Sequence, residues 1–261
     1  MEDKVTILGI RIDNRTSAEI GKAIEQWLRE PSGELVHIVT VNPEFIMMAR
    51  SDPTFKEVLD TATLATADGV GIILAARIQR IRMAARLTGV DLTLLLAGLR
   101  NPAPRIFLLG AAEGVAREAG DRLAERYPGV EIAGAWSGSP RDDDSDEILT
   151  RIADSGADTL LVAFGAPEQD RWIQRHHQAL AGCGIVIAIG VGGTFDYLSG
   201  RVPRAPYLIR RIGFEWLYRL IRQPWRWRRQ LALPKFVALV VWEQLTGKGR
   251  ASVGDHGSTD H

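Results

Sequence analysis

Short apolar runs alternate with amphipathic segments along the first 200 residues. The runs are rich in β-branched residues and apolar at nearly every position, which is typical of parallel strands buried on both faces. This alternation predicts an α/β fold, a Rossmann-like sandwich with a mainly parallel sheet. The predicted strands are Val5–Ile10, Leu35–Val41, Ala62–Thr66, Arg105–Leu109, Glu131–Ala135, Thr159–Phe164 and Gly184–Ile189.

The segments between these strands show the spacing of helices that bury one face. After Gly200 the sequence RVPRAP (Arg201–Pro206) breaks the alternation. We therefore predict an α/β body over residues 1–200, a C-terminal helical appendage over 201–246 and a disordered tail over 247–261. The predicted helices are Ser17–Arg29, Pro43–Arg50, Gly69–Arg80, Gly89–Ala97, Glu113–Tyr127, Asp144–Ser155 and Glu168–Leu180 in the body, with Tyr207–Arg222 and Pro234–Thr246 in the appendage.

The charge of the chain is polarised although its formal net charge is zero. From residue 201 onward there are 12 Lys and Arg against 4 Asp and Glu, whereas residues 1–200 carry 20 against 28. The basic part interleaves Trp and Arg in QPWRWRR (Gln223–Arg229). Such a segment is expected to bind an anionic membrane surface or phosphate groups. The alternative is a basic helix packed on the acidic body.

Composition argues against several other classes of protein. The single cysteine, Cys183, excludes an internal disulfide and fits a reducing cytosol. No apolar run approaches the roughly 20 residues of a spanning helix, so membrane contact is expected to be peripheral. Nucleic-acid binding is not expected, because the basic residues are confined to the Trp-rich tail. No metal site is expected: no cluster has metal-ligand spacing, and Asp142–Asp144 looks like a solvated loop.

Polar or glycine-rich residues follow four of the predicted strands. The carboxyl ends of parallel strands are where ligands gather in open α/β sheets. Thr40 and Asn42 stand at the end of the second strand, Asp68 follows the third, and Gln169 follows the strand that ends at Phe164. The glycine-rich turn Gly190–Asp196 follows the last strand. We expect these turns to line one pocket.

Each of these residues also has a purely structural interpretation. Asp68 could be a general base or could cap the next helix, and Asn42 before Pro43 could also be a cap. Gln169 could be a solvated helix position. The glycine run could seat a phosphate on its backbone N–H groups or could only form a tight turn. Phe195 stands where a dinucleotide fingerprint needs a third glycine, which argues against an NAD(P)-dependent oxidoreductase.

Six short motifs occur in order along nearly the whole chain. They are TVNPEF (Thr40–Phe45), ADGVG (Ala67–Gly71), RLTGVDL (Arg86–Leu92), FLLGA (Phe107–Ala111), AFGAPEQDRW (Ala163–Trp172) and GVGGTFDYLSGRVPRAP (Gly190–Pro206). With the Arg-rich tail, this set resembles the WecG/TagA/CpsF family of bacterial glycosyltransferases. The resemblance implies an inverting transferase that moves a sugar from a UDP-sugar to a polyprenyl-diphosphate-linked sugar in cell-surface polysaccharide synthesis.

The resemblance also implies where the enzyme works and what it binds. The donor sugar would be N-acetylmannosamine, its uronic acid or a glucose type, and neither a metal nor another cofactor is implied. The protein would be cytoplasmic and peripherally bound to the inner face of the plasma membrane, and a homo-oligomer is expected from the family. A nucleotide-binding sensor recruited to membrane without catalysis is the alternative.

Residue roles follow position by position from the matched motifs. Asp68 matches the catalytic base, which takes the proton of the acceptor hydroxyl. Departure of UDP leaves negative charge, and with no metal implied the tail arginines are expected to stabilise it, with Arg219 and Arg222 on one helix face. The expected substrate-binding residues are Thr40, Asn42, Arg86, Gln169, Gly190, Gly192, Gly193, Asp196 and Arg211.

Overall fold

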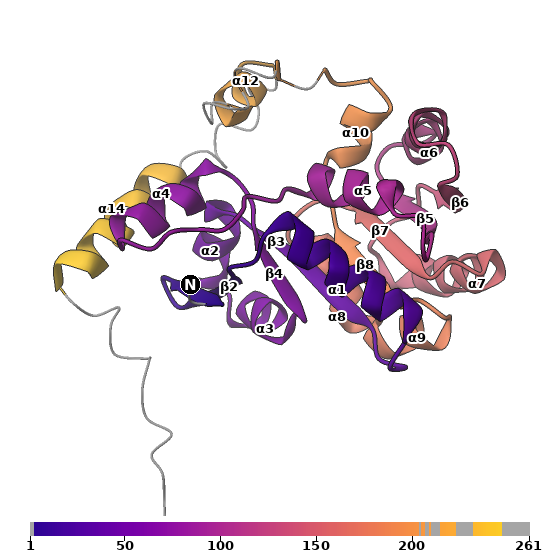
Figure 1. Ribbon diagram of the computed structural model, residues 1–261, viewed down its shortest axis with the longest axis horizontal. Helices are drawn as coiled ribbons and strands as arrows, with labels where there is room; N and C mark the ends of the chain where they lie inside the picture. Colours follow the sequence, from indigo (N-terminus) through magenta and orange to yellow (C-terminus); the bar gives the residue numbers. More distant parts are fainter. Residues whose placement is uncertain (1–2, 204, 207–208, 210–214, 223–231, 247–261) are drawn as a thin grey trace, which may run out of the picture.

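The computed structural model describes residues 3–203, 205–206, 209, 215–222 and 232–246. Its centre is a six-stranded sheet in the order β4-β3-β8-β7-β5-β6, and every neighbouring pair runs parallel (Figure 1). The predicted α/β fold with a parallel sheet is confirmed. The strands are β3 (Val36–Val41), β4 (Leu64–Ala67), β5 (Arg105–Gly110), β6 (Glu131–Trp136), β7 (Thr159–Ala163) and β8 (Ile187–Gly190).

Helices cover both faces of this sheet, and successive strand residues point to opposite faces. In β3, Ile38 joins one core and Val39 joins the other. The first face carries α1 (Ser17–Arg29), α5 (Gly89–Gly98), α6 (Val115–Arg126) and α10 (Thr194–Leu198). The second carries α2 (Pro43–Ala49), α3 (Pro53–Thr61), α4 (Val70–Ile78), α7 (Ser145–Ser155), α8 (Glu168–Arg175), α9 (His177–Gly182) and α14 (Ala232–Thr246).

The predicted strand Val5–Ile10 is wrong. A turn at Leu8 and Gly9, both with positive φ (49° and 81°), divides it into β1 (Lys4–Ile7) and β2 (Ile10–Asp13). These form an antiparallel hairpin outside the main sheet. The Asp13 carboxylate accepts a hydrogen bond from the Ala65 N–H (2.8 Å), so the hairpin covers the otherwise open edge of β4.

Other differences lie at short helices. Helix α3 was not predicted, although Asp52 and Pro53 carry its start signal: the Asp52 carboxylate accepts hydrogen bonds from the N–H groups of Thr54 and Phe55, each at 3.1 Å. The short α10 was also not predicted. The single helix predicted at Glu168–Leu180 is divided near His176 into α8 and α9.

Two helices of the predicted appendage are described, α12 (Glu215–Arg222) and α14. Helix α14 lies beside α4 (Figure 1), and its Phe236 and Val240 belong to the core that α2 and α4 also form. The rest of the helix predicted at Tyr207–Arg222 lies largely outside the described residues, as does the tail 247–261 predicted to be disordered. The boundaries at residues 200 and 246 stay predictions.

Candidate active site

A cavity of about 280 Å³ opens at the carboxyl ends of β3, β4, β5, β7 and β8. This is the sheet edge at which the sequence predicted a pocket. Seven of the expected site residues line it: Thr40, Asn42, Asp68, Gln169, Gly192, Gly193 and Asp196. Its remaining walls are Glu44, Phe45, Gly89, Ala111, Ala112, Ala163, Phe164, Gly165, Ala166 and Val191.

The end of β3 supplies two polar groups to this cavity. Thr40 is buried, and its hydroxyl donates to the Gly190 carbonyl at 3.5 Å, which joins β3 to the end of β8. Asn42 caps α2, since its side-chain oxygen accepts from the Phe45 N–H at 3.0 Å and Pro43 occupies the first turn. The capping interpretation of Asn42 is thus confirmed. Asn42 also lines the cavity, so it orients the backbone of the cavity wall.

Asp68 lies at the turn between β4 and α4. Its N–H donates to the Val41 carbonyl at 2.7 Å, which fixes the turn against β3. The N-cap residue of α4 is Gly69, with φ 87°, which has no side chain of its own to cap the helix. Asp68 directly precedes this N-cap residue, and its two interpretations, general base and helix cap, stay predictions. Glycine tolerates this positive φ, so the chain can turn sharply after Asp68. Asp68 itself is half-buried in the cavity wall.

The backbone at Arg86 lies near the turn that holds Asp68, but Arg86 is not among the described residues that line the cavity. Its neighbour Leu87 donates its N–H to the Ala67 carbonyl at 2.9 Å. The Thr66 hydroxyl donates to the Leu87 carbonyl at 3.1 Å. The segment around Arg86 is therefore held against the end of β4, one residue from Asp68.

The glycine turn after β8 is shaped by its neighbours. A Cβ on Gly190 would lie 2.4 Å from Asp170 Oδ1 and 2.6 Å from Gln169 Nε2, so no larger residue fits without a shift. Gly192 has φ 55°, and its N–H donates to Gln169 Oε1 at 2.9 Å. The Gly192 amide, expected to face a diphosphate, is thus engaged by a side chain. Gly190 contributes close packing and does not line the cavity.

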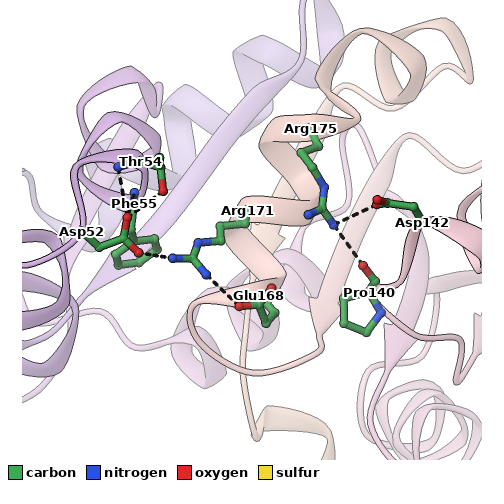
Figure 2. A network of polar contacts seen from close by, with 8 residues as sticks. All are labelled: Asp52, Thr54, Phe55, Pro140, Asp142, Glu168, Arg171 and Arg175. Carbon is green, nitrogen blue, oxygen red and sulfur yellow. Dashed lines mark hydrogen bonds and ion pairs between the residues drawn. The ribbon is translucent and has the colours of Figure 1, made fainter.

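Gln169 is buried, so its interpretation as a solvated position is wrong. Ion pairs hold its helix, α8, in place (Figure 2). Arg171 bridges Asp52 of α3 and Glu168, with 2.9 Å from its Nη1 to Glu168 Oε1. The pKa of Asp52 is lowered, first by the Thr54 hydroxyl, then by the Phe55 N–H and Arg171.

Farther along α8, Arg175 extends to the segment before α7, which includes the short 3₁₀ helix Asp142–Asp144. Its Nη2 donates to the Pro140 carbonyl at 3.0 Å and lies 3.5 Å from Asp142 Oδ1 (Figure 2). Helix α8 is therefore fixed on two sides, by α3 and by this segment. The Arg171 contacts lie nearer the first turn, where Gln169 stands, whereas the Arg175 contacts hold the last residue of the helix.

The cavity wall is acidic. Glu44, Asp68 and Asp196 contribute carboxyl groups, and no Lys or Arg is among the described residues that line it. Arg219 and Arg222 lie on α12, but their side chains fall outside what the structure describes, and Arg211 lies outside the described residues altogether. Among described residues no group of three or more His, Cys, Asp or Glu could hold a metal ion.

Sequence reasoning missed several cavity residues. Glu44 directly follows the capped turn at Asn42 and Pro43, so its position after a strand was an available signal. Ala111 and Ala112 follow β5 and have no polar side chain to draw attention. Ala111 adopts a positive φ of 63°, which the sequence does not signal.

Comparison with known proteins supports the family resemblance that the sequence motifs indicated. The family model described as "Glycosyl transferase WecG/TagA/CpsF family" matches residues 5–250. The chain is 35% identical over 212 residues to a Bacillus subtilis (strain 168) protein, covering 81% of each. It is 30% identical over 237 residues to one from Staphylococcus aureus (strain MW2), covering 90% of this chain and 91% of the relative.

Both relatives are named N-acetylglucosaminyldiphosphoundecaprenol N-acetyl-beta-D-mannosaminyltransferase. A third with the same name, from Bacillus spizizenii (strain ATCC 23059 / NRRL B-14472 / W23), is 36% identical over 220 residues, 84% of this chain and 82% of the relative. The match to the family model spans nearly the whole chain, including β3, β4 and β8, whose ends form the cavity. The chain belongs to the WecG/TagA/CpsF family of glycosyl transferases.

Proposed function

We propose that this protein transfers an N-acetylmannosaminyl group from a UDP donor to N-acetylglucosamine carried on undecaprenyl diphosphate, in cell-envelope polymer synthesis. The relatives' names supply both sugars and the lipid carrier. One observation carries the proposal: Asp68 stands in the wall of a strand-end cavity together with the glycine turn and Gln169. That edge is where open α/β sheets bind nucleotide ligands.

In the proposed reaction, Asp68 is the general base. Its carboxylate takes the proton from the attacking hydroxyl of the acceptor sugar. The hydroxyl oxygen forms a bond to the anomeric carbon of the donor, the bond from that carbon to the UDP oxygen breaks, and the configuration inverts. Removing such a base typically slows a reaction ~10²–10⁴-fold.

UDP departure requires a cation that the described cavity lining does not supply. Three carboxyl groups there would repel a diphosphate, whereas an Arg near the leaving oxygen would stabilise its developing charge. We assign this role to Arg219 and Arg222 of α12, and donor binding to Arg86 and Arg211. The active site would then be completed by the appendage.

The acceptor is attached to lipid, so the enzyme must work beside a membrane. No helix in the described part of the chain is long and apolar enough to cross one. On α14, however, Trp242 and Leu245 are 64% and 79% exposed, and Val70 and Leu74 of neighbouring α4 are also exposed. We propose that this apolar surface, with the basic tail, rests on the anionic inner face of the plasma membrane.

The test is UDP release by purified protein. The acceptor is N-acetylglucosamine on a short-chain polyprenyl diphosphate, and the donors are UDP-N-acetylmannosamine, its uronic acid and UDP-glucose, with no added metal. Each reaction is paired with one lacking acceptor, which measures donor hydrolysis. We expect acceptor-dependent UDP release with UDP-N-acetylmannosamine and a disaccharide-lipid product of matching mass.

Two results would contradict the proposal. If the enzyme releases UDP only from one of the other two donors, N-acetylmannosamine is not the sugar that it transfers. Tight UDP binding without transfer from any donor would favour a membrane-recruited nucleotide sensor.

A further inference from the structure

A His–Asp pair lies buried behind the cavity and has no role in the chemistry above. His37 on β3 and Asp170 on α8 are 1% and 0% exposed. His37 Nε2 lies 3.5 Å from Asp170 Oδ1. Within the described residues, the two ring nitrogens of His37 lack hydrogen-bond partners, and so do the two carboxyl oxygens of Asp170. Buried polar atoms are costly unless paired, so each group depends on the other.

The pair lies next to the glycine turn. A Cβ on Gly190 would meet Asp170 Oδ1 at 2.4 Å, so the carboxyl group packs directly against the last residue of β8. The preceding residue, Gln169, holds the Gly192 N–H at 2.9 Å. Adjacent residues in the first turn of α8 thus make two attachments, to the glycine turn through Gln169 and to β3 through Asp170.

We infer that the His37–Asp170 pair is a positioning device for the donor site. It fixes the rotation of the first turn of α8, and this rotation sets where the Gln169 amide holds Gly192. His37 and Asp170 are positioning residues, since neither lines the cavity. The inference rests on the proposed function, because it takes the Gly190–Gly193 turn as the seat of the UDP-sugar.

The test compares Asp170→Leu with Arg175→Gln in the full-length protein. Leucine has the same number of side-chain heavy atoms and the same branch point as aspartate, but it is bulkier and removes the partner of His37. Arg175→Gln removes a different anchor of α8, the contacts to Pro140 and Asp142, and leaves the first turn untouched. We expect Asp170→Leu to raise the KM for the donor and the Kd for UDP about tenfold, while the acceptor KM changes less than about twofold.

Arg175→Gln should leave all three constants within about twofold of wild type. An unchanged donor KM in Asp170→Leu would overturn the inference. An equal rise of the donor KM and the acceptor KM in both variants would also overturn it, because both changes would then act by loosening the packing of α8 as a whole. If the wild-type protein does not bind UDP, the donor-site assignment itself fails, which separates that failure from failure of the pair.

Since Asp170→Leu could unfold the chain, a second measurement uses the wild-type protein. The ring ¹⁵N resonances of His37 are followed by NMR during titration with UDP, and those of His176 serve as control. His176 lies at the other end of α8, where its ring nitrogen contacts the Trp172 carbonyl at 2.9 Å. UDP binding should shift the His37 signals and leave those of His176 in place. Unmoved His37 signals at saturating UDP would overturn the inference.

Discussion

The side-chain oxygen of Gln169 accepts a hydrogen bond from the Gly192 N–H at 2.9 Å. The bond links the first turn of α8 to the glycine turn after β8, and its two residues are 23 positions apart in the chain. It explains why a glutamine in the middle of an EQDR sequence is buried.

Replacing this glutamine by leucine, of similar size, should weaken donor binding. The Gly192 N–H would lose its acceptor, so the glycine turn would no longer be held in the shape that we propose binds the donor. We expect the UDP Kd measured by calorimetry to rise about tenfold in Gln169→Leu, which is about 1.4 kcal/mol of binding free energy. The same Kd in both proteins would show that the bond does not shape the donor site.

Gly71 lies where α4 packs closely on α2 and α14. A Cβ there would come within 2.4 Å of Pro43 Cγ and 3.2 Å of Leu233 Cδ1. We expect Gly71→Ala to destabilise the fold by about 1–3 kcal/mol, measured by urea unfolding, because overpacking forces the helices apart.

Gly98→Ala is the matched control for this change. Gly98 also lies in a helix, and a Cβ there would meet nothing within 4 Å. Its replacement should be neutral or stabilise by up to about 1 kcal/mol, since alanine restricts the unfolded chain. Equal effects of the two changes would mean that close packing at Gly71 is unimportant.

The ion pair between Asp52 and Arg171 should make stability depend on pH in the acid range. The pKa of Asp52 is lowered in the folded protein, chiefly by the Thr54 hydroxyl. A carboxyl group of this kind stabilises the fold above its unfolded pKa, about 4, and loses that contribution as pH falls through the lower folded pKa. In the Asp52→Asn variant, the new amide side chain could still cap α3 but would not titrate.

The difference in unfolding free energy between wild type and Asp52→Asn should therefore be largest near neutral pH and should shrink below about pH 4. Denaturant melts at a series of pH values measure it. A difference that stays constant from pH 7 to pH 3 would exclude this contribution.

The proposed membrane surface is tested at α14. Changing Trp242 and Leu245 together to serine should weaken sedimentation with vesicles that contain anionic phosphatidylglycerol, because both side chains are exposed. Transfer to a soluble acceptor analogue should not change. Lys56→Ser on α3 serves as control. Undiminished binding would contradict the assignment, and if sedimentation equilibrium showed instead that the serine variant loses an oligomer, this surface would be a subunit interface.

The sequence predicted the parallel sheet well because buried parallel strands are apolar at every position. It failed at Val5–Ile10 because the same apolar pattern hides a turn, and a leucine with positive φ gives no signal of its own. Seven expected residues line the cavity because a parallel sheet brings the ends of its strands to one edge.

Sequence patterns could not predict which residues distant in the sequence contact each other. The local sequence EQDR does not indicate that Gln169 binds the Gly192 N–H. Nor does it indicate that Asp170 lies beside His37, which is far away in the sequence. Nor could position alone decide between a cap and a base at Asp68. The structure adds that Gly69 is the N-cap residue of α4 and that Asp68 lines the cavity.

The role of Asp68 is the central claim, and one comparison tests it most directly. Wild type and Asp68→Asn are assayed in parallel for acceptor-dependent UDP release, with UDP affinity and thermal melting measured on the same samples. We predict that Asp68→Asn lowers kcat ~10²–10⁴-fold while UDP affinity and Tm stay near wild type. An Asp68→Asn protein that retains wild-type kcat would contradict the account, since no base would then be needed at the end of β4.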